Sequence, residues 1–239
     1  MVMETGAEIF QLGNIRMYVS EDHRFGTDAF LLARYAGVHK SDAVCDLCTG
    51  CGIIPLIFCK NVQPRLIHAV DIQEEAIDLL KKTADENGLS AVRPILCDLR
   101  SITQDVITYE SVDIVTANPP YMVGGSGLMK GSEAQAIARH EIMCNIEDVC
   151  AAAAKLLKFG GMLKMCHRPE RLADVICAMR ANRIEPKSIT FVFNDINDKP
   201  WLFLISGKKG ANPGMTVEKP MVLFNSDKSY TEEYMKLYE

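Results

Sequence analysis

Asp46-Leu47-Cys48-Thr49-Gly50-Cys51-Gly52 is the stretch that decides the fold of this 239-residue chain. A short β-rich apolar run, 43–47, leads into it, and a longer apolar run, 53–59, follows it. A strand that enters a glycine-containing turn and then a helix brings the backbone close to a ligand and presents the free N–H groups of the helix N-terminus. Since Gly-x-Gly turns also occur in purely structural loops, the pattern around this stretch has to support a binding role.

Short β-rich runs alternate with longer amphipathic runs from residue 43 onward, which is typical of βαβ units. Helical spacing appears over 73–87, which ends at Asn87-Gly88, and over 145–158, which ends before Gly160-Gly161. The predicted strands are 43–47, 66–70, 93–97, 112–117 and 162–166. The pattern predicts an α/β fold with a doubly wound, mostly parallel, seven-stranded sheet.

The alternation of strand and helix patterns ends after residue 183. There 188–193 and 201–206 indicate two strands joined by a short polar loop. We expect them to form a C-terminal antiparallel hairpin. The whole chain, 1–239, is predicted to be one domain, with a lead-in and cofactor cap at 1–40, a sheet core at 41–207 and a loop-rich tail at 208–239. An amphipathic stretch at 27–36 is expected to cap the ligand site.

Composition places the chain among globular proteins, with 48% apolar and 24% charged residues. It has no apolar run long enough to span a membrane and no basic-then-apolar N-terminus, so we expect a cytoplasmic protein without a membrane partner. Its nine cysteines are an odd number in a sizeable chain, which favours reduced thiols. Oligomeric state cannot be deduced from the sequence.

Charge is unevenly distributed although the net charge is −5. Residues 1–120 carry 10 basic and 17 acidic side chains, whereas residues 121–239 carry 16 and 14. Eight Lys or Arg and three acids lie within 155–187. Such a stretch would attract a polyanion such as RNA, or it is an ordinary solvated helix face.

Two acidic residues follow the next strands of the predicted sheet. Asp71 ends the run 66–71, nineteen residues after Gly52, where a carboxylate suits the paired hydroxyls of a ribose. Asp98 ends the following strand and is expected to accept the amino group of an adenine. A NAD-type dehydrogenase would share these features, but its fingerprint requires a small residue where Pro55 stands. This favours a nucleotide ligand without a diphosphate, such as S-adenosylmethionine.

Asn118-Pro119-Pro120-Tyr121 follows the fourth predicted strand at the edge where ligands of open α/β sheets bind. The prolines fix φ, so the Asn118 side-chain oxygen and the Pro119 carbonyl can face one point. Two convergent acceptors recognise an –NH₂ group and direct its lone pair toward a methyl donor. Tyr121 is expected to stack on a planar acceptor. The alternative is that these residues form only a structural turn.

The motifs DLCTGCG, VD, CD and NPPY, in this order, resemble those of class I S-adenosylmethionine-dependent amino-methyltransferases. Segments 24–33, 118–121 and 138–141 resemble, more closely, the bacterial enzymes that methylate N6 of an anticodon-loop adenine in a valine tRNA. The similarity covers nearly the whole chain. It implies a tRNA partner and S-adenosylmethionine as the cofactor.

The resemblance also assigns roles to individual residues. The segment Asn118 to Tyr121 holds the target base, with Asn118 also touching the cofactor. Arg139 and His140 are expected to contact the substrate, and the alternatives for His140 are deprotonation of the methylated amine or a structural role. The cofactor set comprises Gly26, Thr27, Asp28, Asp46, Cys48, Gly50, Gly52, Asp71, Ile72, Asp98 and Leu99. Cys48 departs from the family, which usually has glycine there, so the backbone must accommodate a Cβ.

Several alternatives remain open at this point. Cys45, Cys48 and Cys51 form a C-x₂-C-x₂-C run that suggests a metal, yet strand and turn geometry should make their side chains diverge, and no metal is predicted. Alternative acceptors with the same planar amine are a protein glutamine amide, a guanine of ribosomal RNA and an adenine of DNA. A non-catalytic nucleotide- or RNA-binding module is the alternative outside enzymes.

Overall fold

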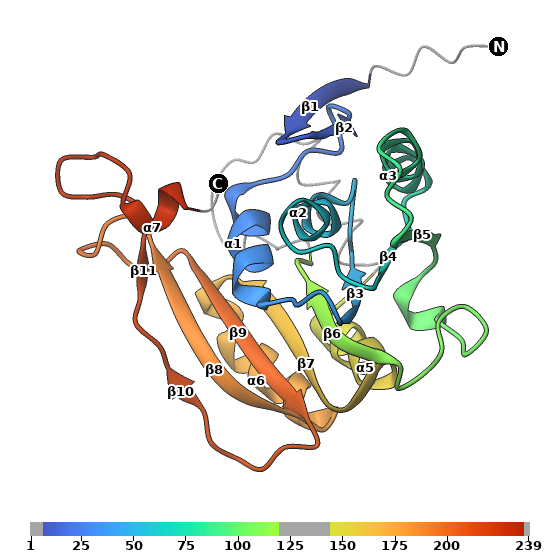
Figure 1. Ribbon diagram of the computed structural model, residues 1–239. Coiled ribbons are helices and arrows are strands. Elements are labelled where there is room, and N and C mark those ends of the chain that lie inside the picture. Colours follow the sequence, from blue (N-terminus) through green and yellow to red (C-terminus); the bar gives the residue numbers. More distant parts are fainter. Residues whose placement is uncertain (1–6, 120–143, 237–239) are drawn as a thin grey trace, which may run out of the picture.

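A computed structural model describes residues 7–119 and 144–236 of the protein (Figure 1). A nine-stranded sheet runs through these residues, with its main path in the order β10-β8-β9-β7-β6-β3-β4-β5 and β11 also paired to β8. The strands of the sheet are β3 (Ala43–Leu47), β4 (Leu66–Asp71), β5 (Val92–Leu96), β6 (Val112–Ala117), β7 (Leu157–His167), β8 (Ile184–Phe193), β9 (Leu202–Lys209), β10 (Thr216–Val217) and β11 (Met221–Val222).

The pairing is parallel except where β9 lies between β7 and β8, with which it pairs antiparallel. The predicted doubly wound, mostly parallel sheet with a C-terminal hairpin is therefore confirmed. Seven of the nine strands were predicted from the sequence, and β10 and β11 were not. The two-residue strands β10 and β11 extend the sheet beyond β8, and they are too short to leave a periodic signal in the sequence.

Helices cover both faces of the sheet (Figure 1). One apolar cluster gathers side chains of α1 (Thr27–Ala36), α2 (Ile53–Asn61) and α3 (Glu74–Glu86), and a second gathers those of α5 (Ile146–Leu156) and α6 (Leu172–Ala181). Short 3₁₀ turns, η1 (Leu99–Ser101) and η2 (Pro169–Arg171), and a final helix, α7 (Glu232–Met235), complete the described elements.

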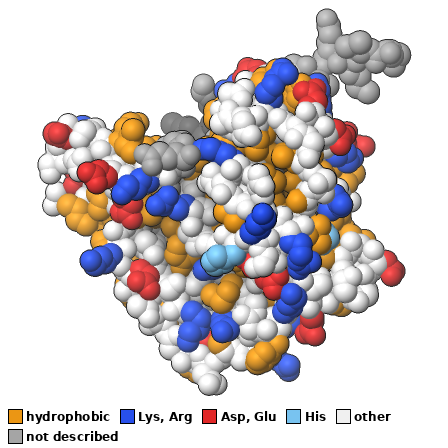
Figure 2. Space-filling model, in the orientation of Figure 1, with side chains coloured by type: hydrophobic (Ala, Val, Ile, Leu, Met, Phe, Trp, Pro, Cys, Tyr) orange, Lys and Arg blue, Asp and Glu red, His pale blue; other side chains and the backbone are white. Residues whose placement is uncertain are grey.

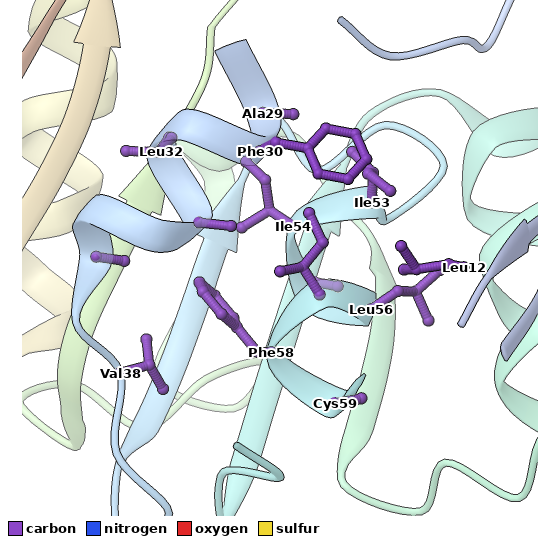
Figure 3. Close-up of a cluster of buried hydrophobic side chains, with 14 of the residues drawn as sticks. Leu12, Ala29, Phe30, Leu32, Val38, Ile53, Ile54, Leu56, Phe58 and Cys59 are labelled. Atoms are coloured by element: carbon purple, nitrogen blue, oxygen red, sulfur yellow. The ribbon is translucent and has the colours of Figure 1, made fainter. Parts of the chain in front are cut away.

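The contact between α1 and α2 holds the lead-in against the core. The ring of Phe30 in α1 lies beside Ile53 and Ile54 of α2 (Figure 3), and Phe58 of α2 belongs to the same cluster. These four side chains are buried, and burying a side chain of this size stabilises a fold by roughly 1.5–3 kcal/mol. The stretch predicted at 27–36 is thus a helix packed on the sheet core.

A hairpin that the sequence did not predict precedes α1. Its strands are β1 (Glu8–Leu12) and β2 (Ile15–Val19), paired antiparallel. It is fastened to α3, because the Tyr18 backbone N–H donates to the Thr83 hydroxyl at 3.0 Å and the Tyr18 hydroxyl contacts the Glu86 carboxylate at 2.7 Å. The single-domain organisation stays a prediction, which this packing of the lead-in supports.

The end of α5 was placed too late by the sequence pattern. The helix stops at Leu156, and β7 begins at the next residue, so Gly160-Gly161 lie inside a strand and do not end a helix. Val112 of β6 pairs with Leu157, and the register then shifts before Ile114 pairs with Met162. Strand pairing thus overrides the local glycine signal. Within the described ranges, no helix has the length and apolarity needed to cross a membrane.

Candidate active site

Two adjoining cavities lie at the carboxyl ends of β3, β4 and β6, with volumes of about 250 and 260 Å³. They share part of their lining: Arg24, Cys48, Gly50, Cys51 and Asn118. The first extends along β4 and β5, and the second extends toward the N-terminus of α1. The turn predicted to bind a ligand and the strand end predicted to bind an acceptor therefore meet at one place.

The turn after β3 is built from left-handed backbone conformations. Cys48, Gly50 and Gly52 have φ values of 58°, 54° and 85°. Space around Gly50 is open, since an added Cβ would meet no atom within 4 Å, whereas a Cβ on Gly52 would overlap the Leu80 side chain. At Cys48 an L-residue adopts a conformation that disfavours a Cβ, so the departure from the family pattern carries a strain of about 1 kcal/mol.

Asp46 lies beneath the turn and not on its surface. Its side chain is fully buried and accepts hydrogen bonds from the hydroxyls of Thr49 (2.7 Å) and Thr116 (2.5 Å). Burial raises the pKa of this carboxyl to about 7, against the opposing effect of the two hydroxyl donors. Asp46 lines neither of the two cavities. Asp46 was expected to contact the cofactor directly. Because its side chain is buried in β3 and points inward, it supports the turn instead.

Asp71 borders the first cavity at the end of β4. One of its carboxylate oxygens accepts from the Gly50 backbone N–H at 2.8 Å, and the other accepts from the Gln73 backbone N–H at 3.0 Å. The carboxylate therefore joins the turn after β3 to the turn after β4. Each oxygen has a second lone pair that can accept from a ligand.

Asp98 borders the same cavity, with Ile72 and Leu99 beside it. Its carboxylate is held by Arg100, whose Nε lies 3.0 Å from both oxygens. This hydrogen bond lowers the pKa of Asp98. The expected acceptor of an adenine amino group is therefore positioned at the cavity but already paired with a guanidinium.

Asn118 is held from two sides at the end of β6. Its amide nitrogen donates to the Asp28 carboxylate at 3.2 Å, and its amide oxygen accepts from the Cys166 thiol at 3.1 Å. A carboxylate only accepts hydrogen bonds, so Asp28 determines which end of the amide faces it. The oxygen of Asn118 must then point the other way, toward β7.

The lead-in contributes to the second cavity. Gly26 and Asp28 line it, together with Pro119, and Asp28 also accepts from the Ala29 backbone N–H at 3.0 Å in the first turn of α1. Thr27 lines neither of the two cavities. The remaining predicted site residues, Pro120, Tyr121, Arg139 and His140, lie outside the described residues.

Two further residues of the site, Cys144 and Cys166, were not predicted. Cys144 lines the first cavity just before α5, and Cys166 is fully buried in β7. Since β6 and β7 are parallel with Ala117 opposite Met165, the residues that follow are also neighbours, and this pairing would have pointed to Cys166. Nothing in the sequence signals Cys144.

The three spaced cysteines do not come together as a ligand set. Cys45 is buried within β3, while Cys48 and Cys51 face the cavities. In residues 7–119 and 144–236 no group of three or more His, Cys, Asp or Glu side chains is arranged to hold a metal ion.

The basic stretch 155–187 is not one continuous patch. Lys158 and Arg168 flank the length of β7, roughly 30 Å apart at the usual rise of a strand. Lys164, between them, lies 5.1 Å from the centre of the Tyr35 ring and is partly buried. Figure 2 shows Lys and Arg side chains scattered over one face with Asp and Glu among them. The basic residues of this stretch are thus spread over α5, β7, α6 and β8.

A mostly parallel sheet with a glycine turn after β3 and an acid at the end of β4 agrees with the class I methyltransferase fold. Solved structures bear this out. A predicted O-methyltransferase from Agrobacterium tumefaciens aligns with a TM-score of 0.70 at 17% identity, over 88% of this chain and 94% of that one. TYW2 of M. jannaschii, solved with AdoMet, aligns with a TM-score of 0.59 at 13% identity, over 87% and 88%.

Residues 18–172 match the methyltransferase small domain family, and the chain belongs to this family. It is therefore an S-adenosylmethionine-dependent methyltransferase. Among curated relatives, the tRNA1(Val) (adenine(37)-N6)-methyltransferase of Phocaeicola vulgatus is 25% identical over 90% of this chain and 88% of its own. The enzyme of the same name from Pedobacter heparinus is 30% identical over 58% and 57%.

Proposed function

We propose that this protein transfers a methyl group from S-adenosylmethionine to N6 of an adenine in tRNA. The observation that carries the proposal is the fixed amide of Asn118 beside a cavity bordered by Asp71. Relatives that span most of the chain and are named for this reaction support the choice of adenine in tRNA.

The cavity suits the proposed cofactor. The open space beside Gly50 admits a ligand close to the backbone, and the Asp71 carboxylate has lone pairs for the ribose hydroxyls. Ile72 and Leu99, which line the cavity with Asp98, would supply apolar contact for the adenine ring. Bound S-adenosylmethionine supplies an electrophilic methyl group. Asp46 supports the turn from below, and Gly52 lets it pack on α3.

The acceptor amine is held by Asn118 and Pro119. The Asn118 side-chain oxygen and the Pro119 carbonyl would each accept one N–H of the amine, which leaves the nitrogen lone pair to attack the methyl carbon. Asp28 has the role of orienting Asn118, because it accepts from the amide nitrogen and leaves the oxygen for the amine. Cys166 donates to the same oxygen at 3.1 Å, and a thiol is a weak donor that an amine N–H can displace.

The nitrogen loses a proton after transfer. A methylated aminopurine cation is strongly acidic, so this step needs no positioned base. Pro120 is proposed to stiffen the turn, Tyr121 to stack on the base, and Arg139 and His140 to contact the RNA. All four proposals rest on the resemblance of the sequence to the family.

The proposed partner is tRNA, and the proposed location is the cytoplasm. RNA that is recognised in a loop presents unstacked bases and a folded shape, so the protein can bind it without one continuous basic face. This agrees with the scattered distribution of Lys and Arg in Figure 2.

The test is to incubate the protein with S-adenosylmethionine and unmodified valine tRNA transcripts, and to identify methylated nucleosides by mass spectrometry. We expect N6-methyladenosine in the anticodon loop. A transcript with that adenine replaced by guanine is the matched control and should stay unmethylated. Methylation of a release-factor glutamine or of ribosomal RNA, with none in tRNA, would replace this substrate by one of the alternatives.

A further inference from the structure

Three phenylalanine rings lead from the core to the surface beside the second cavity, the one lined by Asn118. Phe30 of α1 is buried, Phe25 is half-buried, and Phe10 of β1 is exposed. The ring centroids of Phe30 and Phe25 are 5.9 Å apart, and those of Phe25 and Phe10 are 5.0 Å apart in an edge-to-face arrangement. Phe25 lines the second cavity together with Asn118. The reaction as proposed uses neither Phe25 nor Phe10.

Phe10 is the outermost of these rings and is held in place. It leaves 38% of its surface exposed, although burial of an apolar ring is favourable. Its cross-strand partner in the hairpin is Met17 of β2, which is fully buried. The hairpin is also fastened to α3 through the Tyr18 backbone N–H. Phe10 therefore presents a fixed apolar ring to solvent, next to a residue that lines the cavity.

A guanidinium lies beside the same rings. Arg24 directly precedes Phe25 and lines both cavities. It donates to the Glu8 carboxylate at 2.9 Å, and Glu8 lies two residues before Phe10, on the same side of β1. Both side chains of this ion pair are more than half exposed, and an exposed pair contributes little to stability. A phosphate group can therefore replace Glu8 as the partner of Arg24.

An aromatic ring beside an arginine suits one unstacked nucleotide. Loops of RNA are recognised by stacking their splayed bases on aromatic side chains, while Arg contacts the backbone. Glu21 and Asp22 are exposed and close to Arg24 in the sequence, and their charges oppose a run of phosphates. The surface therefore fits a single base that leaves a loop, and it does not fit a duplex.

We propose that Phe10 stacks on a nucleotide next to the target adenine, and that Arg24 contacts the phosphate of this nucleotide. The inference rests on the proposed function, because it takes the acceptor to be an adenine in an RNA loop. An enzyme that acts on one base draws it out of the stack, and contacts to the flanking nucleotides then contribute to substrate choice. With the target amine at Asn118, a flanking nucleotide would lie at the rim of the cavity, where Phe25 supports the Phe10 ring.

Phe10 has a positioning role in this arrangement. It lines neither of the two cavities, so it touches neither the cofactor site nor the acceptor amine. Loss of the ring should weaken binding of the RNA equally before and during transfer, which raises KM and leaves kcat unchanged. We expect KM for tRNA to rise about tenfold, as for the loss of one stacked base. The dissociation constant for S-adenosylmethionine should stay the same.

The experiment combines variants of the full chain with altered valine tRNA transcripts. Phe10→Leu keeps apolar volume against Phe25 and removes the ring, whereas Phe10→Tyr keeps the ring. Phe159→Leu is the matched control, because Phe159 is 81% exposed in β7 and lines neither cavity. The transcripts are intact or carry an abasic site at one neighbour of the target adenine, with each neighbour tested in turn. KM and kcat of methyl transfer are measured for every combination.

We expect Phe10→Leu to raise KM on the intact transcript, and Phe10→Tyr and Phe159→Leu to resemble the wild type. An abasic site at one neighbour should raise KM for the wild type by the same factor and add nothing in Phe10→Leu, because each change removes one partner of the same contact.

Three outcomes would overturn the stacking contact: an unchanged KM in Phe10→Leu, an equal rise in Phe10→Tyr, or an abasic effect that multiplies in full with that of Phe10→Leu. Each of these leaves methylation of tRNA by the wild type intact. If the wild type methylates no tRNA, the proposed function has failed and the stacking contact with it.

Discussion

The two halves of the candidate site are built in different ways. At the ends of β3 and β4 the site is made of backbone, with left-handed residues at Cys48, Gly50 and Gly52. At the end of β6 it is made of side chains, with the Asn118 amide held by residues of α1 and β7. The first half is local in sequence, whereas the second joins distant segments.

This difference indicates which property of the protein a substitution in each half should change. A change in the backbone half should alter stability and cofactor affinity, because the turn is part of the folded core. A change in the side-chain half should alter the rate of transfer and leave the fold intact. Four predictions follow this division, from the largest effect to the smallest.

Asn118→Ala removes the proposed acceptor of the amine. We expect kcat to fall more than about a thousandfold, equivalent to about 4 kcal/mol, since both the binding of the amine and the direction of its lone pair are lost. The dissociation constant for S-adenosylmethionine should change by less than about threefold, as measured by calorimetry. Near-normal turnover would contradict the role of the side-chain half.

Asp46→Asn tests the support of the backbone half through pH. The pKa of about 7 in the folded protein exceeds that of an unfolded aspartate. The stability from this group is therefore fully present below pH about 4, lost as pH rises toward 7, and constant above it. Between pH 5 and 8 the wild type should lose about 3 kcal/mol more than the variant in urea unfolding. Parallel pH profiles for the two proteins would rule out this contribution.

Asp28→Asn leaves a group of the same size at the start of α1 but no longer determines the orientation of the Asn118 amide. We expect kcat to fall about tenfold, or about 1.4 kcal/mol, because two amides can pair in either direction. The melting temperature should stay the same, since the asparagine oxygen can still accept from the Ala29 backbone N–H. A change in stability with unaltered kcat would make Asp28 a structural residue only.

Cys48→Gly removes a Cβ from a residue with a φ of 58°. The relief of strain exceeds the added entropy of the unfolded glycine, so we expect a gain of less than about 1 kcal/mol in the free energy of unfolding. Cys48→Ala keeps the Cβ and is the matched control, with no gain expected. Equal stability of both variants would show that the turn carries no strain here.

Much of the backbone half could be predicted from the sequence, because it depends on neighbouring residues. The turn 46–52, the strand β6 and the helix α1 were found where the pattern placed them. The direction of a buried side chain was not predictable, and so Asp46 was expected in the cavity, where it does not lie. The Arg100 partner of Asp98 follows only two residues later, yet its bond depends on the 3₁₀ turn η1 that Asp98 caps.

The side-chain half depends on contacts that only the folded chain reveals. Asp28 and Cys166 meet at Asn118 because α1 and β7 both pack against β6, and no local pattern encodes this meeting. The short strands β10 and β11 escaped prediction for a similar reason, since pairing with the distant strand β8 defines them.

Asn118 is held by Asp28, which precedes it in the sequence, and by Cys166, which follows it. The parts of the site therefore form in a fixed order during synthesis. The turn after β3 needs about the first half of the chain, because Thr116 of β6 donates to Asp46 beneath it and β3 pairs with β6. The amide of Asn118 can be fixed from both sides only after Cys166 has left the ribosome. A growing chain can therefore form its cofactor turn well before its acceptor site, and a product truncated before β7 would lack the second hold on Asn118.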